Sequence, residues 1–361
     1  MRFPEFSGEW KREILNDVCT FHNGRAYKLN ELLSDGKFRV LRVGNFFTND
    51  SWYYSDLELD DEKVAVNGDL LYAWSASFGP RFWTGEKVIY HYHIWKIDSF
   101  QQVSKEFLFY FLERDTEKIK NEVQGGTMVH ITKGDMEKRE ILYPSILEQS
   151  KIARLLSLLD ERIATQNKII EDLKKLKSAI RKKLLCNDKW TTYKIQDIAE
   201  IGRGRVISSV EIDRQKHPLY PVYSSQTSND GIMGYLDSYM FDGEYITWTT
   251  DGANAGTVFY RKGKFNCTNV CGTLKIQPKF DCYFVSLVLQ QATQKYVSSN
   301  LANPKLMNNT MASIKIRMPN IETQKQLSKV FQTLDSCLLV HQRTCKMYLS
   351  EKQYLLCQMF I

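Results

Sequence analysis

The sequence predicts an α/β protein with two mixed α/β heads and two long helices that pair as an antiparallel coiled coil, related by an internal pseudo-twofold repeat. Three observations support this fold class. Residues 144–163 and 319–338 share one pattern at an offset of 175 residues. An apolar period of 3.5 residues runs on from each copy, and short β-branched and aromatic runs precede each copy. Because repeats dictate architecture, we interpret the chain as two copies of one module.

The repeat extends well beyond the two quoted segments. Its offset drifts from 175 to 180 residues toward the start of each copy, as different loop lengths would produce. The matched pairs are Met136 and Met311, Ile141 and Ile316, Pro144 and Pro319, Gln149 and Gln324, Asp160 and Asp335, Lys177 and Lys352, and, at the larger offset, Trp10 and Trp190, Asp17 and Asp197, and Arg25 and Arg205.

Each copy ends in a long helix, expected over 148–186 and 319–361. Neither Pro nor Gly interrupts 148–186 or 320–361, and roughly 33 residues would extend about 50 Å. One such helix could bury its stripe on its own head, but two helices with the same stripe favour reciprocal burial. The predicted helix–helix interface consists of Ile152, Leu156, Leu159, Ile163, Ile170, Leu173, Ile180 and Leu184 with Leu327, Phe331, Leu334, Leu338, Tyr348, Leu355 and Met359. Both stripes turn polar at matched sites, at Gln166 and Lys177 and at His341 and Lys352.

The heads are expected at residues 1–147 and 187–318. Strand-like runs occupy 38–43, 68–74, 87–97, 243–250, 256–265 and 271–276, bounded by turn signals such as Asn67-Gly68 and Asp251-Gly252. A helical pattern at 104–122 has a counterpart at 281–297. The polar middles of the heads differ most, which suggests two binders that read different things.

Length and composition limit the functions that the protein can have. With 361 residues, the chain exceeds the size of a single core, and no apolar run approaches the roughly 20 residues of a membrane span, so we expect a cytoplasmic protein without a membrane anchor. A net charge of +7 is compatible with a polyanionic partner. The eight cysteines lack disulfide or zinc spacing, and no Cys or carboxylate near His91 and His93 completes a site, so no metal is predicted.

Motifs for catalysis are missing. Adenine methylation needs an Asn/Asp-Pro-Pro-aromatic motif, and the sequence contains no Pro-Pro pair. ATP-driven cleavage needs a phosphate-binding Gly-Lys-Ser/Thr, whereas Gly36-Lys37 and Gly263-Lys264 are both followed by Phe. We therefore expect no catalytic residue and no cofactor, and a stand-alone nuclease or methyltransferase is improbable on these grounds.

The whole chain resembles the specificity subunit of type I restriction-modification systems. The resemblance rests on a Trp-led entry at Trp10 and Trp190, a variable head, a Pro-x-x-x-Glu/Thr-Gln entry at 144–149 and 319–324, and a long helix after each entry. It implies a target recognition domain in each head that reads one half of a bipartite target in double-stranded DNA. It implies helices that set the spacer and dock two methyltransferase subunits, which ATP-dependent restriction subunits can join. The competing interpretation is a coiled-coil structural adaptor with protein-binding heads.

Polar segments at the ends of the strand-like runs are the candidates for DNA contacts. Arg and Lys suit guanine and phosphate, Asn and Gln suit adenine, and acidic groups accept from cytosine. Any one of these residues could instead be a solvated turn residue, and 202–205 (GRGR) is better interpreted as a basic loop than as a nucleotide-binding turn. The candidates are Arg25, Tyr27, Lys28, Arg42, Asn45, Ser75, Ser77 and Arg81 in the first head, and Arg203, Arg205, Ser224, Ser225, Gln226, Thr249, Asp251, Asn254 and Lys305 in the second.

Overall fold

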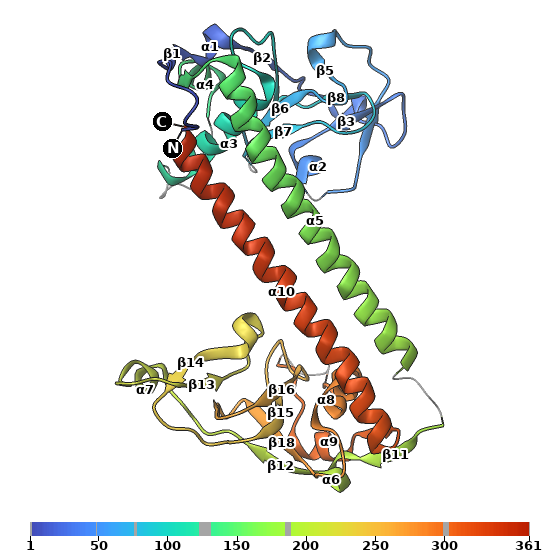
Figure 1. Ribbon diagram of the computed structural model, residues 1–361. Coiled ribbons are helices and arrows are strands. Elements are labelled where there is room, and N and C mark those ends of the chain that lie inside the picture. The colour runs from blue at the N-terminus through green and yellow to red at the C-terminus, as the bar shows by residue number, and fades with distance from the viewer. Residues whose placement is uncertain are drawn as a thin grey trace. The chain divides into compact units, whose positions relative to one another are not determined.

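The computed structural model describes residues 2–47, 49–75, 78–122, 131–184, 189–298 and 303–360. The chain divides into two compact units, unit 1 (residues 1–168 and 342–361) and unit 2 (residues 169–341). Each unit contains one head, a stretch of α5 (Ile146–Leu184) and a stretch of α10 (Ile321–Met359), which lie side by side within it (Figure 1). Both helices have 39 residues; α5 begins two residues before the predicted 148, and α10 begins two residues after the predicted 319. Among the described residues, no helix has the length and apolarity needed to span a membrane.

The head of unit 1 is built on two four-stranded sheets and one two-stranded sheet. The first sheet has the order β2 (Thr20–Asn23), β9 (Ile94–Asp98), β6 (Leu70–Ala73) and β7 (Gly79–Phe82); the second has the order β4 (Tyr53–Ser55), β3 (Phe38–Leu41), β8 (Val88–Tyr90) and β5 (Val64–Ala65); β1 (Lys11–Ile14) pairs with β10 (Glu140–Tyr143). The helices of this head are α1 (Leu15–Val18), α2 (Val43–Phe47), α3 (Lys105–Glu122) and α4 (Lys133–Glu137).

The head of unit 2 repeats this plan with one strand fewer in its second sheet. The first sheet has the order β12 (Ala199–Arg203), β18 (Cys271–Ile276), β15 (Glu244–Thr249) and β16 (Val258–Lys262); the second has the order β14 (Ile232–Leu236), β13 (Tyr220–Tyr223) and β17 (Asn266–Cys267); β11 (Thr191–Lys194) pairs with β19 (Lys315–Met318). The helices of this head are α6 (Ile195–Ile198), α7 (Ser209–Asp213), α8 (Cys282–Ala292) and α9 (Asn308–Ser313).

Apart from the extra strand β5 of unit 1, the pairing within the sheets is the same in the two heads. The first sheets are antiparallel throughout, and each second sheet contains one parallel pair, β3 with β8 and β13 with β17. The internal repeat therefore includes the middles of the heads, where the sequence resemblance between the copies is weakest.

Each of the six predicted strand-like runs contains a strand, and the run over 87–97 contains two. A turn at residues 91–93 divides this run into β8 and β9, which belong to different sheets. The chain leaves strand geometry there because the backbone N–H groups of His91 and Tyr92 donate to Leu41 and Arg25, which lie in other segments. Aromatic composition alone cannot indicate that such a run changes sheet.

The largest hydrophobic core of each unit joins its head to both long helices. In unit 1, Trp95 and Phe107 of the head share a core with Leu156 of α5 and Met359 of α10. In unit 2, Trp248 and Phe284 share a core with Phe331 of α10, and Ile180 of α5 packs against it. Burial of one large apolar side chain contributes roughly 1.5–3 kcal/mol. Hydrophobic burial therefore holds each head on its stretches of both helices.

The predicted interface positions follow the burial pattern of the two helices. Every such position whose side chain is described is buried or half-buried, and most positions between them are exposed. The side chain of Leu184 lies outside the described residues. A narrow apolar stripe with a 3.5-residue period thus faces inward along both helices.

The repeated glutamine has a structural reason. Gln149 is fully buried; its amide oxygen accepts from the Ser104 backbone N–H (2.7 Å), and its amide nitrogen donates to the Gln102 (2.8 Å) and Pro144 (2.9 Å) carbonyls. In unit 2, Gln324 accepts from the Asp281 N–H (3.0 Å) and donates to the Pro319 carbonyl (2.8 Å). One buried amide therefore ties the start of α3, or of α8, to the start of the long helix that follows.

We expect Gln149→Met to lower the free energy of unfolding by about 1–3 kcal/mol, because it leaves buried backbone groups without a partner at nearly unchanged side-chain volume. Gln326→Met, at an exposed position of α10, is the matched control and should change little. Urea unfolding followed by circular dichroism measures both. Equal unfolding midpoints for the two variants would contradict the anchoring role of Gln149.

Candidate nucleic-acid interface

The candidate side chains gather at one edge of each head, which we call the loop edge. In unit 1, β2 and β6 both run antiparallel to β9, and Asn23 and Tyr72 both lie opposite Trp95. In unit 2, β12 and β15 both run antiparallel to β18, and Arg203 and Trp248 both lie opposite Gly272. Because the strands end at the same level, the loops that follow them are presented together. Loops held on a rigid scaffold are a common place for recognition.

A turn at residues 91–93 forms the centre of the loop edge in unit 1. The His91 N–H donates to the Leu41 carbonyl (2.9 Å), the Tyr92 N–H to the Arg25 carbonyl (3.0 Å), and the Trp74 N–H to the His93 carbonyl (3.1 Å). The turn thus joins the three segments in which the sequence places its candidates. We call residues 91–93 the central turn of unit 1.

Residues 268–270 form the equivalent central turn of unit 2. The Thr268 N–H donates to the Tyr223 carbonyl (2.9 Å), and the Thr250 N–H donates to the Val270 carbonyl (2.9 Å). Arg205 forms a parallel bridge with Thr268, as Arg25 does with His91. The two central turns therefore occupy the same place in the repeated scaffold.

Gly24 and Gly204 allow their segments to pass close to the backbone at the central turns. A Cβ atom on Gly24 would lie 2.3 Å from the His91 carbonyl oxygen, and one on Gly204 would lie 2.2 Å from the Cys267 carbonyl oxygen. No larger residue fits either crossing without displacing backbone. This close approach explains the repeated Gly-Arg pair of the sequence.

Sequence reasoning missed the exposed tips of the central turns. Tyr92 has an exposed fraction of 39%, and Asn269, its counterpart in unit 2, is also exposed. The sequence does contain a signal for this equivalence: at an offset of 177 residues, His-Tyr-His at 91–93 aligns with Thr-Asn-Val at 268–270. The scaffold thus presents a different side chain at the same point of each head.

Arg25 and Arg205 make matched ion pairs. Arg25 binds Glu31 (2.6 Å), and Arg205 binds Glu211 with both of its terminal nitrogens. The Lys28 backbone N–H, assisted by Arg25, lowers the pKa of Glu31, and the hydrogen bond from Arg205 lowers the pKa of Glu211. Both arginines therefore brace their loops while part of each guanidinium remains exposed.

The remaining candidate side chains of unit 1 differ in how accessible they are to a ligand. Asn45 donates its amide to the Asn49 (2.8 Å) and Ser51 (2.9 Å) carbonyls, and Arg42 donates to Ser51 (3.1 Å), so both support the turn after α2. Arg81 is exposed and lies over the Phe47 ring at 4.5 Å. Lys28 is also exposed, Tyr27 stacks on His91, and Ser77 lies outside the described residues.

Two candidates lie inside the heads. Ser75 and Thr249 have exposed fractions of 8% and 1%. A ligand could reach either side chain only if the loop edge opened. Thr249 is the last residue of β15, and Ser75 lies two residues after β6, so both side chains lie at strand ends of the first sheets.

Unit 2 brings three candidates from distant segments together. Arg203 donates to Asp251 (3.0 Å) and to the Thr250 hydroxyl (2.9 Å), and the Lys305 ammonium lies 3.8 Å from the other Asp251 oxygen. Arg203 also donates to the Asn269 carbonyl at the central turn (2.5 Å). The result is a cluster with two cations and one carboxylate, whose net positive charge suits a phosphate group.

The loop 224–231 carries three further candidates. The Asn254 amide donates to the Ser225 carbonyl (3.0 Å), the Gln226 amide donates to the Ile232 carbonyl, and the Thr268 and Ser224 hydroxyls lie 3.2 Å apart. These contacts connect the loop to the segment after β15 and to the central turn.

Arg261, which the sequence analysis missed, holds the same loop from inside. Its guanidinium lies 3.5 Å from the Tyr223 ring centroid and 4.4 Å from that of Phe259, and it donates to the Asp230 carbonyl (2.7 Å). Burial lowers the pKa of Arg261. Asn229 and Asp230 adopt positive φ angles of 49° and 52°, an uncommon conformation that this contact supports.

Among the described residues, no group of three or more His, Cys, Asp and Glu side chains is arranged to hold a metal ion. His91 and His93 lie in the central turn rather than on a strand. Burial, assisted by the positive charges of His93 and Arg42, lowers the pKa of His91 to about 4. The imidazole of His91 is therefore neutral near pH 7.

Two copies of one scaffold with different polar edges define a class of protein with two related heads that present different side chains. The family model for the type I restriction modification DNA specificity domain matches residues 7–175 and again 187–346. The chain therefore belongs to this family and carries two copies of its domain. Its role is that of a DNA-specificity subunit, a non-catalytic component of a type I restriction-modification system.

Individual relatives agree with this assignment. A protein of Mycoplasma pneumoniae named as a type I specificity subunit is 39% identical over 198 residues, which cover 54% of this chain and 82% of the relative. The specificity subunit of the type I restriction enzyme MpnII from the same organism is 43% identical over 152 residues, 42% of this chain and 46% of the relative. The fold is similar to the crystal structure of a type I S subunit from M. genitalium, with a TM-score of 0.72, 17% identity and coverage of 100% of this chain and 99% of that chain.

The lowered pKa of His91 predicts a pH dependence of stability. Between pH 6.5 and about 4, the unfolded chain binds a proton at His91 that the folded chain does not, so stability should fall as the pH falls through this window. The variant His91→Asn should lose less stability than the wild type between pH 7.5 and pH 5, measured by urea unfolding. His217→Asn, at an exposed position, serves as the control. Equal losses for His91→Asn and the wild type would contradict the prediction.

Proposed function

We propose that each head reads one half of a bipartite target in double-stranded DNA through its loop edge, and that the long helices hold the two heads at a fixed spacing. The observation that carries this proposal is the repeated loop edge, built twice on one scaffold with different side chains at its tip. Arg203 and Lys305 suit phosphate, whereas Tyr92, Asn269 and Gln226 offer groups that can contact bases.

The spacer is an antiparallel coiled coil in this proposal. Asp160 of α5 pairs with Lys352 of α10 (2.7 Å), and the Asn167 amide oxygen lies 3.4 Å from the Cys345 sulfur. Seven residues forward on α5 thus correspond to seven residues back on α10. The pair Lys177 and Asp335 in unit 2 obeys the same register. Together with the inward apolar stripes, this register supports helices that run in opposite directions along one seam.

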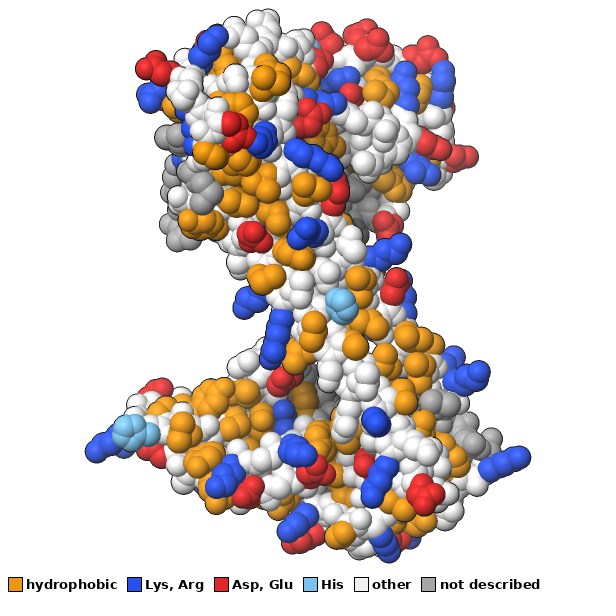
Figure 2. All heavy atoms as spheres, in the orientation of Figure 1, with side chains coloured by type: hydrophobic (Ala, Val, Ile, Leu, Met, Phe, Trp, Pro, Cys, Tyr) orange, Lys and Arg blue, Asp and Glu red, His pale blue; other side chains and the backbone are white. Residues whose placement is uncertain are grey.

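The outer faces of the helices are proposed to dock two methyltransferase subunits, which ATP-dependent restriction subunits can join. Hydrophobic side chains are exposed among charged ones on the face in Figure 2. Those exposed on the long helices include Leu158, Leu176, Val330, Leu339, Val340, Met347, Leu349 and Tyr354. Exposed apolar surface of this kind supports a protein partner.

The proposed division of labour follows four segments. Residues 1–147 and 187–318 are the target recognition domains, and 148–186 and 319–361 are the spacer helices. We infer that the protein works in the cytoplasm, with its DNA. An adaptor with protein-binding heads is not favoured, because both heads match a DNA specificity domain.

The tips of the central turns provide a direct test. In the complex with cognate modification subunits, Tyr92→Ala should alter or weaken recognition of one half-site, and Asn269→Ala that of the other. Loss of one good base contact costs about 1–3 kcal/mol, or roughly 10- to 100-fold in discrimination. Single-molecule sequencing of methylated DNA reads both half-sites and the gap between them.

Lys262→Ala is the matched control, because Lys262 is exposed and pairs with Glu244 at the far end of the β15–β16 hairpin. It should leave both half-sites unchanged. If Tyr92→Ala and Asn269→Ala left both half-sites and their methylation unaltered, the loop edge would not be the reading surface.

A further inference from the structure

Two matched clusters of polar side chains interrupt the apolar seam. In unit 1, the Asp160 carboxylate accepts from the Tyr110 hydroxyl (2.9 Å) and from the Lys352 ammonium (2.7 Å). In unit 2, Asp335 accepts from the Tyr283 hydroxyl (2.5 Å) and from Lys177. We call each set of three side chains a triad.

Each triad joins three different elements. The Tyr belongs to the helix of the head, α3 or α8, the Asp to the long helix that follows this head, and the Lys to the other long helix. One carboxylate oxygen therefore faces the head, and the other faces the second helix. The Asp and Lys positions repeat at the same offset of 175 residues, and the Tyr positions at 173.

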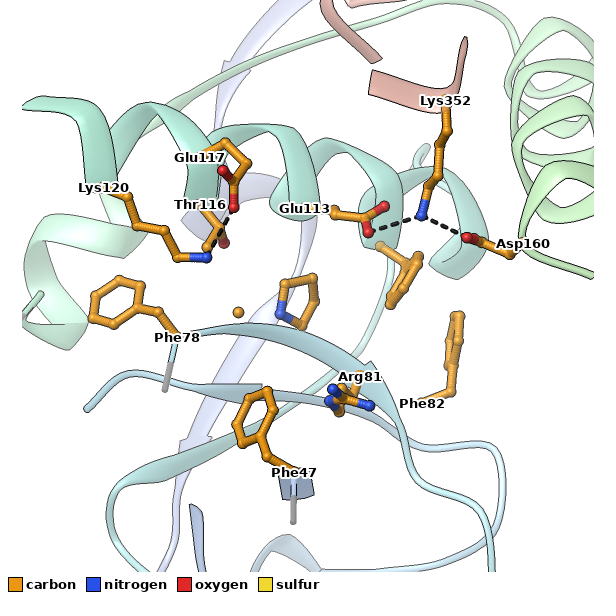
Figure 3. Close-up of a pocket in the computed structure, with 13 residues that line it drawn as sticks. Phe47, Phe78, Arg81, Phe82, Glu113, Thr116, Glu117, Lys120, Asp160 and Lys352 are labelled. Carbon is orange, nitrogen blue, oxygen red and sulfur yellow. Dashed lines mark hydrogen bonds and ion pairs between the residues drawn. The ribbon is translucent and has the colours of Figure 1, made fainter. Parts of the chain in front are cut away.

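The lysine positions are two of the polar interruptions in the predicted seam. The side chain of Lys352 is 10% exposed and that of Lys177 is 22% exposed. Figure 3 shows Lys352 extending from α10 to Asp160 and Glu113, with Glu113 accepting at 2.8 Å, beside a cavity of about 380 Å³. An ammonium group with little exposure, as in Lys352, is stabilised by its carboxylate partners.

Burial also affects the tyrosines of both triads and Glu113, the second carboxylate partner of Lys352. Burial, followed by the nearby aspartate, raises the pKa of both Tyr110 and Tyr283, so each hydroxyl keeps its proton and donates. Burial also raises the pKa of Glu113, and the nearby Lys352 ammonium opposes this rise. The side chains of Asp160 and Asp335 are 39% and 40% exposed, whereas the tyrosine and lysine of each triad are more buried and depend on the aspartate for pairing.

A shift of the helices by one heptad would break both triads. Lys352 would then face Asn167 or Ala153 in place of Asp160, and Lys177 would face Gln342 or Ser328 in place of Asp335. The apolar seam alone would discriminate weakly between the native register and one shifted by a heptad, because such a shift again places apolar side chains opposite apolar side chains over much of the seam. A buried polar group at a seam position is an effective way to fix register.

We propose that the two triads are positioning residues that fix the register of the helix pair and the seat of each head on it, and thereby set the gap between the two half-sites. The part that concerns the gap rests on the proposed function. The part that concerns register rests on the triad geometry alone, so the two parts can fail separately.

A native cysteine provides a probe of register in the full-length chain. Asn167→Cys places a thiol beside Cys345, which Asn167 contacts in the native register. Mild oxidation followed by peptide mass mapping then measures the fraction of chains with a disulfide between positions 167 and 345. The unit 1 triad is made apolar by Tyr110→Phe, Asp160→Leu and Lys352→Met, and the unit 2 triad by Tyr283→Phe, Asp335→Leu and Lys177→Met. Glu113→Leu accompanies the unit 1 changes, because Glu113 also pairs with Lys352.

Loss of either triad alone should leave the disulfide yield unchanged, because the other triad holds the register. Loss of both should lower the yield by roughly twofold or more, and methylated sites with a second gap length should appear. The free energy of unfolding should not fall, since apolar residues often replace buried ion pairs without loss of stability. Lys174→Met with Lys346→Met, at exposed positions, is the control and should change none of these quantities.

A disulfide yield that stays high without both triads would overturn the register assignment. A lower yield with a single unchanged gap would overturn the link to DNA spacing. A lower yield in a protein whose unmodified form shows no bipartite methylation would support the register assignment and refute the proposed function.

If the variant without both triads does not fold, a charge exchange replaces it. In the background that lacks the unit 1 triad, Asp335→Lys should lower the disulfide yield, and the addition of Lys177→Asp should restore it. Failure of the second change to restore the yield would also overturn the proposal.

Discussion

The burial of each head against apolar side chains of both α5 and α10 is the constraint on which each unit depends. Each head completes its core with side chains from both helices, as Leu156 and Met359 do in unit 1 and Phe331 and Ile180 do in unit 2. A head therefore cannot be held by one helix alone. Hydrophobic burial is non-directional, whereas hydrogen bonds require a defined geometry. The buried amides of Gln149 and Gln324 therefore fix the orientation in which each head packs on its helix.

The heads show how one scaffold can serve two recognition tasks. Their sheets, crossing glycines and Arg–Glu pairs repeat, whereas the tips of the central turns carry Tyr92 in one head and Asn269 in the other. Residues that support the loops, such as Asn45 and Arg261, satisfy backbone carbonyls and leave little freedom to the chain. Under the proposed function, a few exposed side chains on this rigid support determine what each head binds.

Local and periodic features could be predicted from the sequence, and long-range contacts could not. Helical period, turn glycines and the internal repeat are written in neighbouring residues, so both long helices and the turn at Asp251-Gly252 were predicted. The division of residues 87–97 between two sheets depends on carbonyls of Leu41 and Arg25, which no local pattern reveals. For the same reason, the partners of Arg261 and Lys352 were not visible, although the polar interruption at position 352 was.

The most direct test of the account is to lengthen the spacer and map methylation. One heptad added to each long helix at the level of Asn167 and Cys345 lengthens the pair by about 10 Å, or about 3 bp of DNA at roughly 3.4 Å per base pair. We predict that both half-sites keep their bases and that the gap between them grows. Altered bases in either half-site, with the gap unchanged, would contradict the view that the helices measure distance while the heads read sequence.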